Sequence, residues 1–260
     1  MVDVPHLPHG LRALGPYVLI KVLRIEDGVF HFLSQQPSGN HVVVKFLPTD
    51  RSEQGHRKAD QLKAEAELAR HAAPMIAGNL LDHAETKTGA YSVVEYIEGD
   101  TLEYFISRHG AMDRFAVRRL AMGLATLLVA AHHANIALRD LKADKILLSP
   151  DGPRLTGFSG SAIIDESLNK SRKDDEFAND LIAWGNILLY AATGIRAPDR
   201  ASGGTGDAIR EISNIPAPKD FDPDLLAIIR SVLEKSPDKS TTAEQVLDQL
   251  IDLSTSLPEE

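Results

Sequence analysis

The sequence contains no cysteine, and this absence removes several kinds of chemistry at once. Disulfide bonds, thiolate zinc sites, iron–sulfur clusters and cysteine nucleophiles are all excluded. Basic residues are also in deficit, with 28 lysines and arginines against 37 aspartates and glutamates, which gives a net charge of −9. Such a chain has no broad basic surface for nucleic acid, so any site that binds phosphate must concentrate positive charge locally.

Long hydrophobic runs are missing as well. The most apolar stretch, Ala121 to Ala131, has 11 residues, well short of the roughly 20 that span a bilayer. The first ten residues, MVDVPHLPHG, have no basic region followed by an apolar run, so no secretory signal is expected. With 43% hydrophobic and 25% charged residues, we expect a folded cytoplasmic protein of one large domain or two lobes, with no membrane segment.

The first third of the chain is rich in β-branched residues that are interrupted by turn-prone segments. One segment rich in alanine, glutamate, lysine and leucine, residues 57–73, has apolar residues at helical spacing and precedes Pro74. Strands are expected at residues 17–23, 29–33, 41–47, 79–83 and 91–97. The pattern therefore predicts a five-stranded antiparallel sheet with one helix.

After Gly99 the periodicity becomes mainly helical. Helices are expected at residues 101–108, 113–134, 176–193, 222–233 and 242–253. Asp113 stands where an N-cap residue is favoured, and so does either Thr241 or Thr242 before the last helix. The charged run Ser171 to Glu176 is interpreted as a solvated loop. The whole chain is thus assigned to the α+β class.

Several motifs occur in an order that resembles a bacterial-type Ser/Thr protein kinase domain. They are VVVK at 42–45, YSVVEYIEGDTL from 91, LRDLKADKILL at 138–148, LTGFS at 155–159 and NDLIAWGNILLYAATG from 179. The resemblance implies a bilobal fold with an N-lobe at residues 15–97 and a C-lobe at 98–254. Residues 1–14 would be an extension and residues 255–260 a tail.

The resemblance also implies roles for individual residues. Lys45 matches the family lysine that contacts the phosphates. Glu65 is the expected helix partner of that lysine, and Glu67 is an alternative. An alignment without a gap would instead place Ala64 at this position. In the segment that joins the lobes, the residues expected to line a nucleotide are Val94, Glu95 and Ile97. Asp180 matches the buried aspartate of the family, which hydrogen-bonds the catalytic-loop backbone.

The stretch that matches the phosphate-binding loop departs from the family pattern. GxGxxG becomes Leu23-Arg24-Ile25-Glu26-Asp27-Gly28, which keeps only the last glycine. Glu26 and Asp27 bring two carboxylates to this place, and like charges about 4 Å apart cost on the order of 4 kcal/mol near a surface. If they point inward they oppose triphosphate binding, and if they point outward the cost largely vanishes.

The magnesium ligands of the family are replaced. The family motif HRDLKxxN corresponds to residues 138–145 of this chain. The aspartate and the lysine of the motif are kept as Asp140 and Lys142, but Lys145 stands in place of the metal-binding asparagine. DFG reads Gly157-Phe158-Ser159, which removes the principal carboxylate ligand. A lysine has only donors and a positive charge, so it cannot bind magnesium. The 20 residues between Ser159 and Asp180 are also few for an activation segment, and they contain no APE tripeptide.

These departures predict a pseudokinase, a regulatory or scaffolding module in which Asp140 is vestigial and in which magnesium is not expected. Lys142 and Lys145 would supply the charge for ATP or another nucleotide bound without metal. The alternative is a weak or atypical transferase that uses Asp140 and Lys45. A protein partner is expected, nucleic acid is not, and the chain would be a module of a longer protein.

Overall fold

A computed structural model of the chain describes residues 10–49, 52–72, 74–165, 170–196, 221–233 and 241–255. The chain divides into two compact units. The first runs to Ile97 and includes Gly157–Ser159, and the second contains Glu98–Thr156 and the chain from Gly160 onward.

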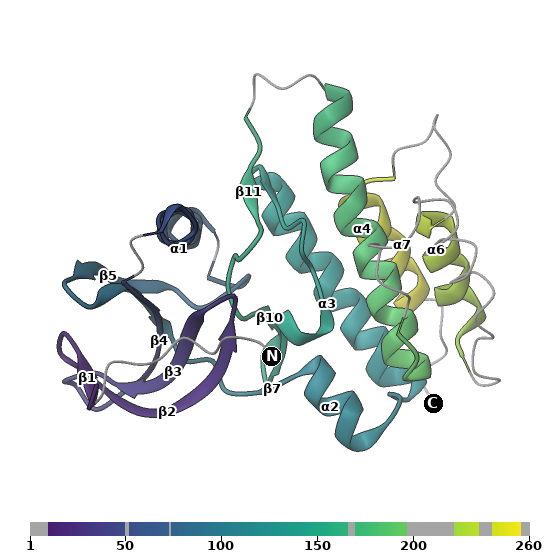
Figure 1. Ribbon diagram of the computed structural model, residues 1–260. Coiled ribbons are helices and arrows are strands. Elements are labelled where there is room, and N and C mark those ends of the chain that lie inside the picture. The colour runs from purple at the N-terminus through teal and green to yellow at the C-terminus, as the bar shows by residue number, and fades with distance from the viewer. Residues whose placement is uncertain are drawn as a thin grey trace. The chain divides into compact units, whose positions relative to one another are not determined.

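The first unit is a six-stranded antiparallel sheet with one helix (Figure 1). The strands occur in the spatial order β1-β2-β3-β4-β6-β5. Their bounds are β1 Ala13–Leu14, β2 Tyr17–Glu26, β3 Val29–Gln35, β4 His41–Pro48, β5 Leu80–Thr86 and β6 Gly89–Glu95. The five expected strands are present, and the two-residue β1 is added at the edge of the sheet. β1 lies within the segment that the sequence assigned to an N-terminal extension.

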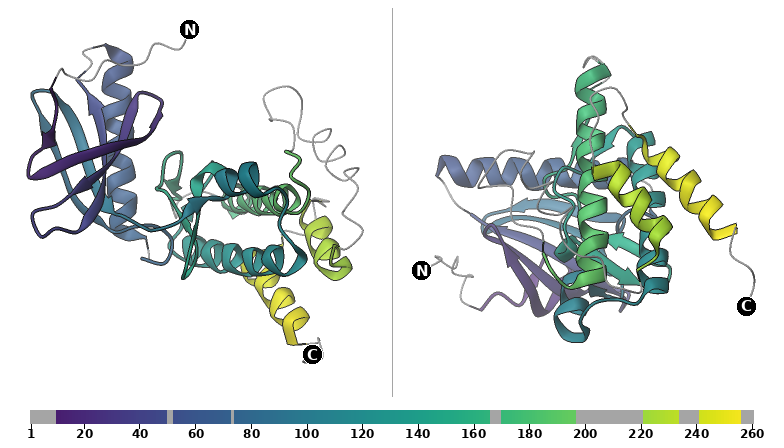
Figure 2. Two further views of the ribbon diagram at one scale, coloured as in Figure 1. Left: turned by 90° about the horizontal axis from the view of Figure 1, so that it is seen from below. Right: turned by 90° about the vertical axis from the view of Figure 1, so that its right-hand side faces the viewer.

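The helix of the first unit, α1, extends over Glu53–His71 and lies against β4, β5 and β6 (Figures 1 and 2). It begins four residues before the expected start at position 57 because Ser52 is its N-cap. The Ser52 hydroxyl oxygen accepts a hydrogen bond of 3.0 Å from the Gly55 N–H, which satisfies one of the free amides at a helix start. The glycine in this first turn hides the helix in the sequence, since glycine disfavours helices.

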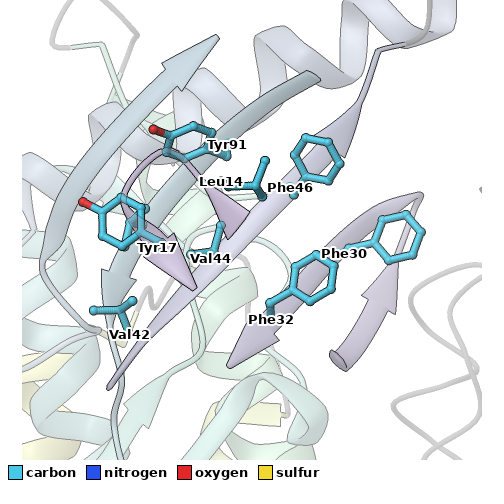
Figure 3. Packing of buried hydrophobic residues seen from close by; sticks show 9 residues of the cluster. Leu14, Tyr17, Phe30, Phe32, Val42, Val44, Phe46 and Tyr91 are labelled. Atoms are coloured by element: carbon cyan, nitrogen blue, oxygen red, sulfur yellow. The ribbon is translucent and has the colours of Figure 1, made fainter. Parts of the chain in front are cut away.

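One face of the sheet carries a core of aliphatic and aromatic side chains (Figure 3). The cluster consists of Leu14, Tyr17, Phe30, Phe32, Val42, Val44, Phe46, Tyr91 and Val93. Along β4, Val42, Val44 and Phe46 point into this cluster because alternate residues of a strand share a face. Lys45, which lies between them, therefore projects from the opposite face, and that face carries the candidate site.

The second unit is mainly helical. Its described helices are α2 Leu102–His109, α3 Arg114–His133, α4 Lys170–Thr193, α6 Pro223–Leu233 and α7 Ala243–Thr255, with the short 3-10 helix η1 Ala143–Lys145. Two small sheets accompany them, one in the order β10-β9-β7 and one in the order β11-β8. Their strands are β7 Asp100–Thr101, β8 Ile136–Ala137, β9 Ile146–Ser149, β10 Gly152–Leu155 and β11 Ala162–Ile163.

Helices α3, α4, α6 and α7 pack side by side in the second unit (Figure 2). Trp184 of α4 is fully buried, and its indole Nε1–H donates to the carbonyl oxygen of Ala121 in α3 at 3.1 Å. By length and composition alone, α3 is one helix that could cross a membrane. That is weak evidence, because a core helix passes the same test, and nine residues of α3 are buried.

The charged run Ser171 to Glu176 is not the loop that the sequence suggested. It forms part of α4, which begins at Lys170 and not near Glu176 (Figure 1). Two of its charged side chains have partners within the unit, because Lys173 Nζ donates a hydrogen bond to Asn135 Oδ1 at 2.5 Å and Glu176 forms an ion pair with Arg139. Charge alone therefore misled the interpretation, since a helix can carry such a run when partners lie opposite.

Candidate functional site

The first unit contains what we call the Lys45 cluster, formed by Lys45, Glu65, Gly157 and Phe158. β4 supplies Lys45 and α1 supplies Glu65, and their side chains form an ion pair. Lys45 is only 2% exposed. The same Glu65 oxygen accepts a hydrogen bond of 2.9 Å from the Phe158 N–H. The Glu65 carboxylate thus connects β4, α1 and the backbone at Phe158.

The sequence left open whether Glu65 or Glu67 is the helix partner of Lys45, and the structure distinguishes between them. Glu65 faces Lys45, whereas Glu67 lies 3.7 Å from the guanidinium of Arg70 on the same helix. Lys45 itself is buried and does not project into solvent. Its role toward a nucleotide stays a prediction.

A row of buried polar side chains crosses the sheet at Lys45. The strand register places His31 of β3 directly opposite Lys45 and places Ser92 of β6 on its other side. All three are buried. His31 Nε2 also lies 4.0 Å from the Glu26 carboxylate. Sequence reasoning missed His31, although the short turn between the two strands fixes their register and would have placed it opposite Lys45.

The three residues expected to line a nucleotide lie at the end of the first unit. Val94 and Glu95 end β6, where Val94 pairs with Val43, and Ile97 is partly buried. The Glu95 carboxylate accepts hydrogen bonds from the Asn79 side-chain amide at 2.9 Å and from the Asn79 N–H at 3.2 Å. The side chain of Glu95 is therefore engaged within its own unit.

The stretch expected to cradle phosphates is a tight hairpin. β2 ends at Glu26 and β3 begins at Val29, so only Asp27 and Gly28 form the turn. Both have positive φ, 50° and 86°, as a two-residue type I′ turn requires. The Glu26 carboxylate is 3.0 Å from the Arg24 guanidinium. Its charge is thus offset locally, and the repulsion expected from an unpaired inward carboxylate is reduced.

The second unit contains what we call the Asp140 cluster, formed by Asp140, Lys142 and Lys145. Lys142 Nζ lies 2.8 Å from one carboxylate oxygen of Asp140, and Lys145 Nζ lies 2.5 Å from the other. Lys145 is held in η1, where its N–H donates to the Lys142 carbonyl at 3.0 Å. Its side chain is 6% exposed, whereas that of Lys142 is 59% exposed. Lys145 is therefore the built-in counter-ion of Asp140.

Two opposing effects set the pKa of Asp140. Burial raises this pKa, since it disfavours the charged form, while hydrogen bonds and charge from Lys142 and Lys145 lower it. The lysines prevail, and the pKa of Asp140 lies below its ordinary value. A carboxylate held in this way is a weak acceptor for a proton near neutral pH.

The donor set at these positions does not fit magnesium. The cation requires oxygen ligands, but Lys145 presents an ammonium and Gly157 has no side chain. Among the residues that the structure describes, no group of three or more histidines, cysteines, aspartates or glutamates could hold a metal ion.

Asp180 of α4 fixes the loop that precedes Asp140. Its carboxylate is 1% exposed and accepts hydrogen bonds from the Leu138 N–H at 2.8 Å and the Arg139 N–H at 2.7 Å. Arg139 has φ of 56°, and the Asp140 N–H donates across it to the Leu138 carbonyl at 2.5 Å. Such a three-residue turn is strained, so the surrounding contacts must hold it.

The N-terminal half of α4 provides further contacts to this loop. Glu176 accepts two parallel hydrogen bonds of 3.0 Å from the Arg139 guanidinium. Lys173 binds Asn135, which also has positive φ, and Phe177 stacks on His132 with ring centroids 4.1 Å apart. Sequence reasoning missed Glu176 and Lys173 because it placed them in a solvated loop.

These features define a class of protein. Protein kinase domains combine three of these features. They have a sheet whose buried lysine binds a helix glutamate, a helical unit that carries the LRDLK loop, and a buried aspartate that binds the backbone of that loop. The family model described as "Protein kinase domain" matches residues 28–179. The chain therefore belongs to the protein kinase family.

Three of its relatives are bacterial proteins described as serine/threonine-protein kinases. "Probable serine/threonine-protein kinase PkwA" of Thermomonospora curvata is 29% identical over 95% of the chain and 35% of that protein. AfsK of Streptomyces coelicolor is 27% identical over 72% of the chain and 25% of that protein. PknK of Mycobacterium tuberculosis is 27% identical over 96% of the chain and 24% of that protein. The chain thus spans about a third or less of the length of these relatives.

Proposed function

We propose that this chain is a pseudokinase, a protein kinase fold that regulates or scaffolds a partner and does not carry out magnesium-dependent phosphoryl transfer. The observation that carries this proposal is the Lys145 ammonium, bound to Asp140 from the position of a family magnesium ligand. Phosphoryl transfer depends on metal to neutralise the developing charge on the phosphates. The loss of both protein ligands, here at Lys145 and Gly157, leaves that charge without its usual anchor.

The state of Asp140 supports the same proposal. In an active kinase this carboxylate accepts the proton of the attacking hydroxyl. Here each of its oxygens already accepts from an ammonium, and its pKa is lowered by those lysines. The two lysines would therefore compete with a substrate hydroxyl for these oxygens. Asp140 acts in our proposal as a structural carboxylate.

Nucleotide binding without metal is the form of ligand binding that we propose. Two ammonium groups contact one carboxylate in the Asp140 cluster, which brings two positive charges to this loop. Lys142 is the more exposed of the two, with 59% of its side chain exposed, so we propose that it is the lysine that meets the anion. A thermal-shift series with ATP, with and without EDTA, tests this directly. If ATP leaves the melting temperature unchanged in both conditions, nucleotide binding is no longer part of the proposal.

The partner and the location belong to the proposal as well. The chain covers only 35% of PkwA and less of the other relatives named above, and we propose that it is a module of a longer cytoplasmic protein. With a net charge of −9, its partner would be a protein and not a nucleic acid.

A weak or atypical transferase is the second candidate. It is favoured by the intact Lys45–Glu65 pair and by the retention of Asp140. Incubation of the purified chain with radiolabelled ATP and generic protein substrates separates the two candidates when Asp140→Ala is run in parallel. We expect no label transfer above the level of the variant. Transfer that depends on Asp140 would establish the second candidate.

A further inference from the structure

One end of the second unit collects exposed apolar side chains. Helix α2, the start of α3 and the C-terminal end of α4 meet there (Figure 1). The Met112 N–H donates to the Ala191 carbonyl at 2.7 Å, and Arg196 forms an ion pair with Glu103. Among the described residues of this unit, five large hydrophobic side chains are exposed. Three of the five lie at this end, namely Tyr104, Phe115 and Ile195.

Two of these exposed side chains are rings that carry an arginine. Arg108 Cζ lies 5.4 Å from the ring centroid of Tyr104 on α2, and Arg114 Cζ lies 4.6 Å from that of Phe115 at the start of α3. Tyr104 is 47% exposed and Phe115 is 56% exposed. A guanidinium stacked on a ring keeps its N–H donors in its own plane, where they can bind a carboxylate. We call these four residues the arginine–aromatic patch.

The patch is basic although the chain as a whole is acidic. Residues 104–119 contain four arginines and a single acidic residue, whereas the whole chain has a net charge of −9. That acidic residue, Asp113, is engaged as the N-cap of α3. Arg114 is the first residue of α3, where the helix dipole favours an anion over a cation. The helix itself thus disfavours Arg114, so its presence calls for another explanation.

We propose that the arginine–aromatic patch binds an acidic segment of a protein partner. Its two arginines bind carboxylates of the segment, and its two rings pack against a neighbouring apolar side chain. A nucleic acid fits less well, because its dense phosphates are repelled by a protein of net charge −9. The inference names the chemistry of the partner that the proposed function requires, and in that respect it rests on the proposed function.

The test uses the full chain and a fluorescein-labelled peptide of about twelve residues in which glutamates alternate with leucines. Fluorescence anisotropy gives its dissociation constant for the wild type, Arg114→Glu and Arg230→Glu. Arg230→Glu is the matched control, since it reverses the charge of an exposed arginine on another helix of the same unit, α6. We expect Arg114→Glu to weaken binding at least about tenfold, and Arg230→Glu to weaken it less than about twofold.

A thermal melt separates lost binding from lost folding. Arg114→Glu puts a carboxylate into the first turn of α3, where the dipole favours it, so Tm should not fall. The role of the ring is tested with Phe115→Ser and a second peptide that has serine in place of leucine. Phe115→Ser should weaken binding of the leucine peptide on the order of fivefold and of the serine peptide less than about twofold. Equal weakening of both peptides would overturn the role of the ring.

Other results would overturn the proposal as a whole. Unchanged anisotropy up to about 1 mM peptide would show that the patch does not bind this class of segment. Equal weakening by Arg114→Glu and Arg230→Glu would show that only net charge attracts the peptide. Tighter binding of a single-stranded oligonucleotide would identify a nucleic acid instead. A dimer in sedimentation that Arg114→Glu dissociates would identify a second copy of this chain as the occupant.

These measurements need no ATP, so their failure is distinguishable from failure of the pseudokinase proposal. If label transfer that depends on Asp140 were found while peptide binding depended on Arg114, the pseudokinase proposal would fail and the role of the patch would stand. If the peptide did not bind and no label were transferred, only the chemistry assigned to the partner would fail.

Discussion

The two charge clusters of this protein differ in how much of the family pattern they keep. The Lys45 cluster keeps both partners of its ion pair, one on β4 and one on α1. The Asp140 cluster keeps its aspartate and Lys142 but carries Lys145, in place of the family asparagine, as the buried partner of that aspartate. A buried charge must be paired wherever it sits, whether or not it still takes part in chemistry.

This difference separates residues that the fold requires for stability from residues that only the reaction requires. The Lys45–Glu65 pair joins the sheet to its helix, so losing either partner would leave a buried charge unpaired even in a protein without activity. The asparagine of the family serves the metal, and once metal binding is no longer required a lysine can neutralise Asp140 instead. The retention of Lys45 and Glu65 therefore has a structural explanation that does not require catalysis.

The largest effect is expected at the Lys45 cluster. Lys45→Met leaves Glu65, whose side chain is 14% exposed, without its ammonium, and we expect a loss of about 3–5 kcal/mol in the free energy of unfolding. Urea unfolding measures it. Arg57→Ala is the control, since it breaks the exposed pair of Arg57 with Glu53 on the same helix and should cost below about 1 kcal/mol. Equal losses in the two variants would show that the buried Lys45–Glu65 pair contributes no more to stability than an exposed pair on the same helix.

A smaller loss is expected at the Asp140 cluster. Lys145→Met removes one buried ammonium, but Lys142 stays within 2.8 Å of Asp140, so the aspartate keeps a partner. We expect a loss of no more than about 2 kcal/mol in urea unfolding, the scale of one hydrogen bond to a charged group. A loss as large as that of Lys45→Met would show that the two clusters are equally dependent on their lysines.

The contact between α4 and the loop is expected to contribute less again. Glu176→Gln weakens the two hydrogen bonds to Arg139, whose side chain is 44% exposed. We expect a global loss of about 0.2–1 kcal/mol together with faster hydrogen exchange of the Leu138 and Arg139 amides. Unaltered exchange of these amides would mean that Asp180 alone fixes the loop.

The smallest effect concerns pH. Because the lysines lower the pKa of Asp140, its contribution to stability is present above the ordinary carboxyl pKa of about 3.9 and is lost as the pH falls through the lowered value. The difference in stability between the wild type and Asp140→Asn should therefore shrink as the pH falls below about 4. Asp151→Asn, an exposed aspartate of the same unit, serves as the control. A difference that grows with acid would contradict the pairing.

Much of the fold was predictable because its signals are local. Alternation along β4 and the cap at Asp113, which accepts from the Phe115 and Ala116 amides, follow from residue type and spacing. The start of α4 was not predictable in this way. Its first turns carry a charged run whose partners Asn135 and Arg139 lie more than 30 residues earlier in the sequence.

The site was predictable where motifs mark it and not where it depends on register or burial. The motif around Asp140 identified the lysines, but their exposures of 59% for Lys142 and 6% for Lys145 depend on η1 and the surrounding chain. His31 has no motif and enters the site only through its cross-strand position opposite Lys45. The hydrogen bond from the Phe158 amide to Glu65 likewise joins segments more than 90 residues apart.

The most direct test of the central claim is a calorimetric titration of the purified chain with ATP, once in magnesium chloride and once in EDTA. With Lys145 and Gly157 in place of the two ligands, we predict that magnesium gives no increase in affinity for the nucleotide. Binding of ATP on the order of tenfold tighter in magnesium than in EDTA, about 1.4 kcal/mol, would contradict the claim that this kinase fold has lost its metal site.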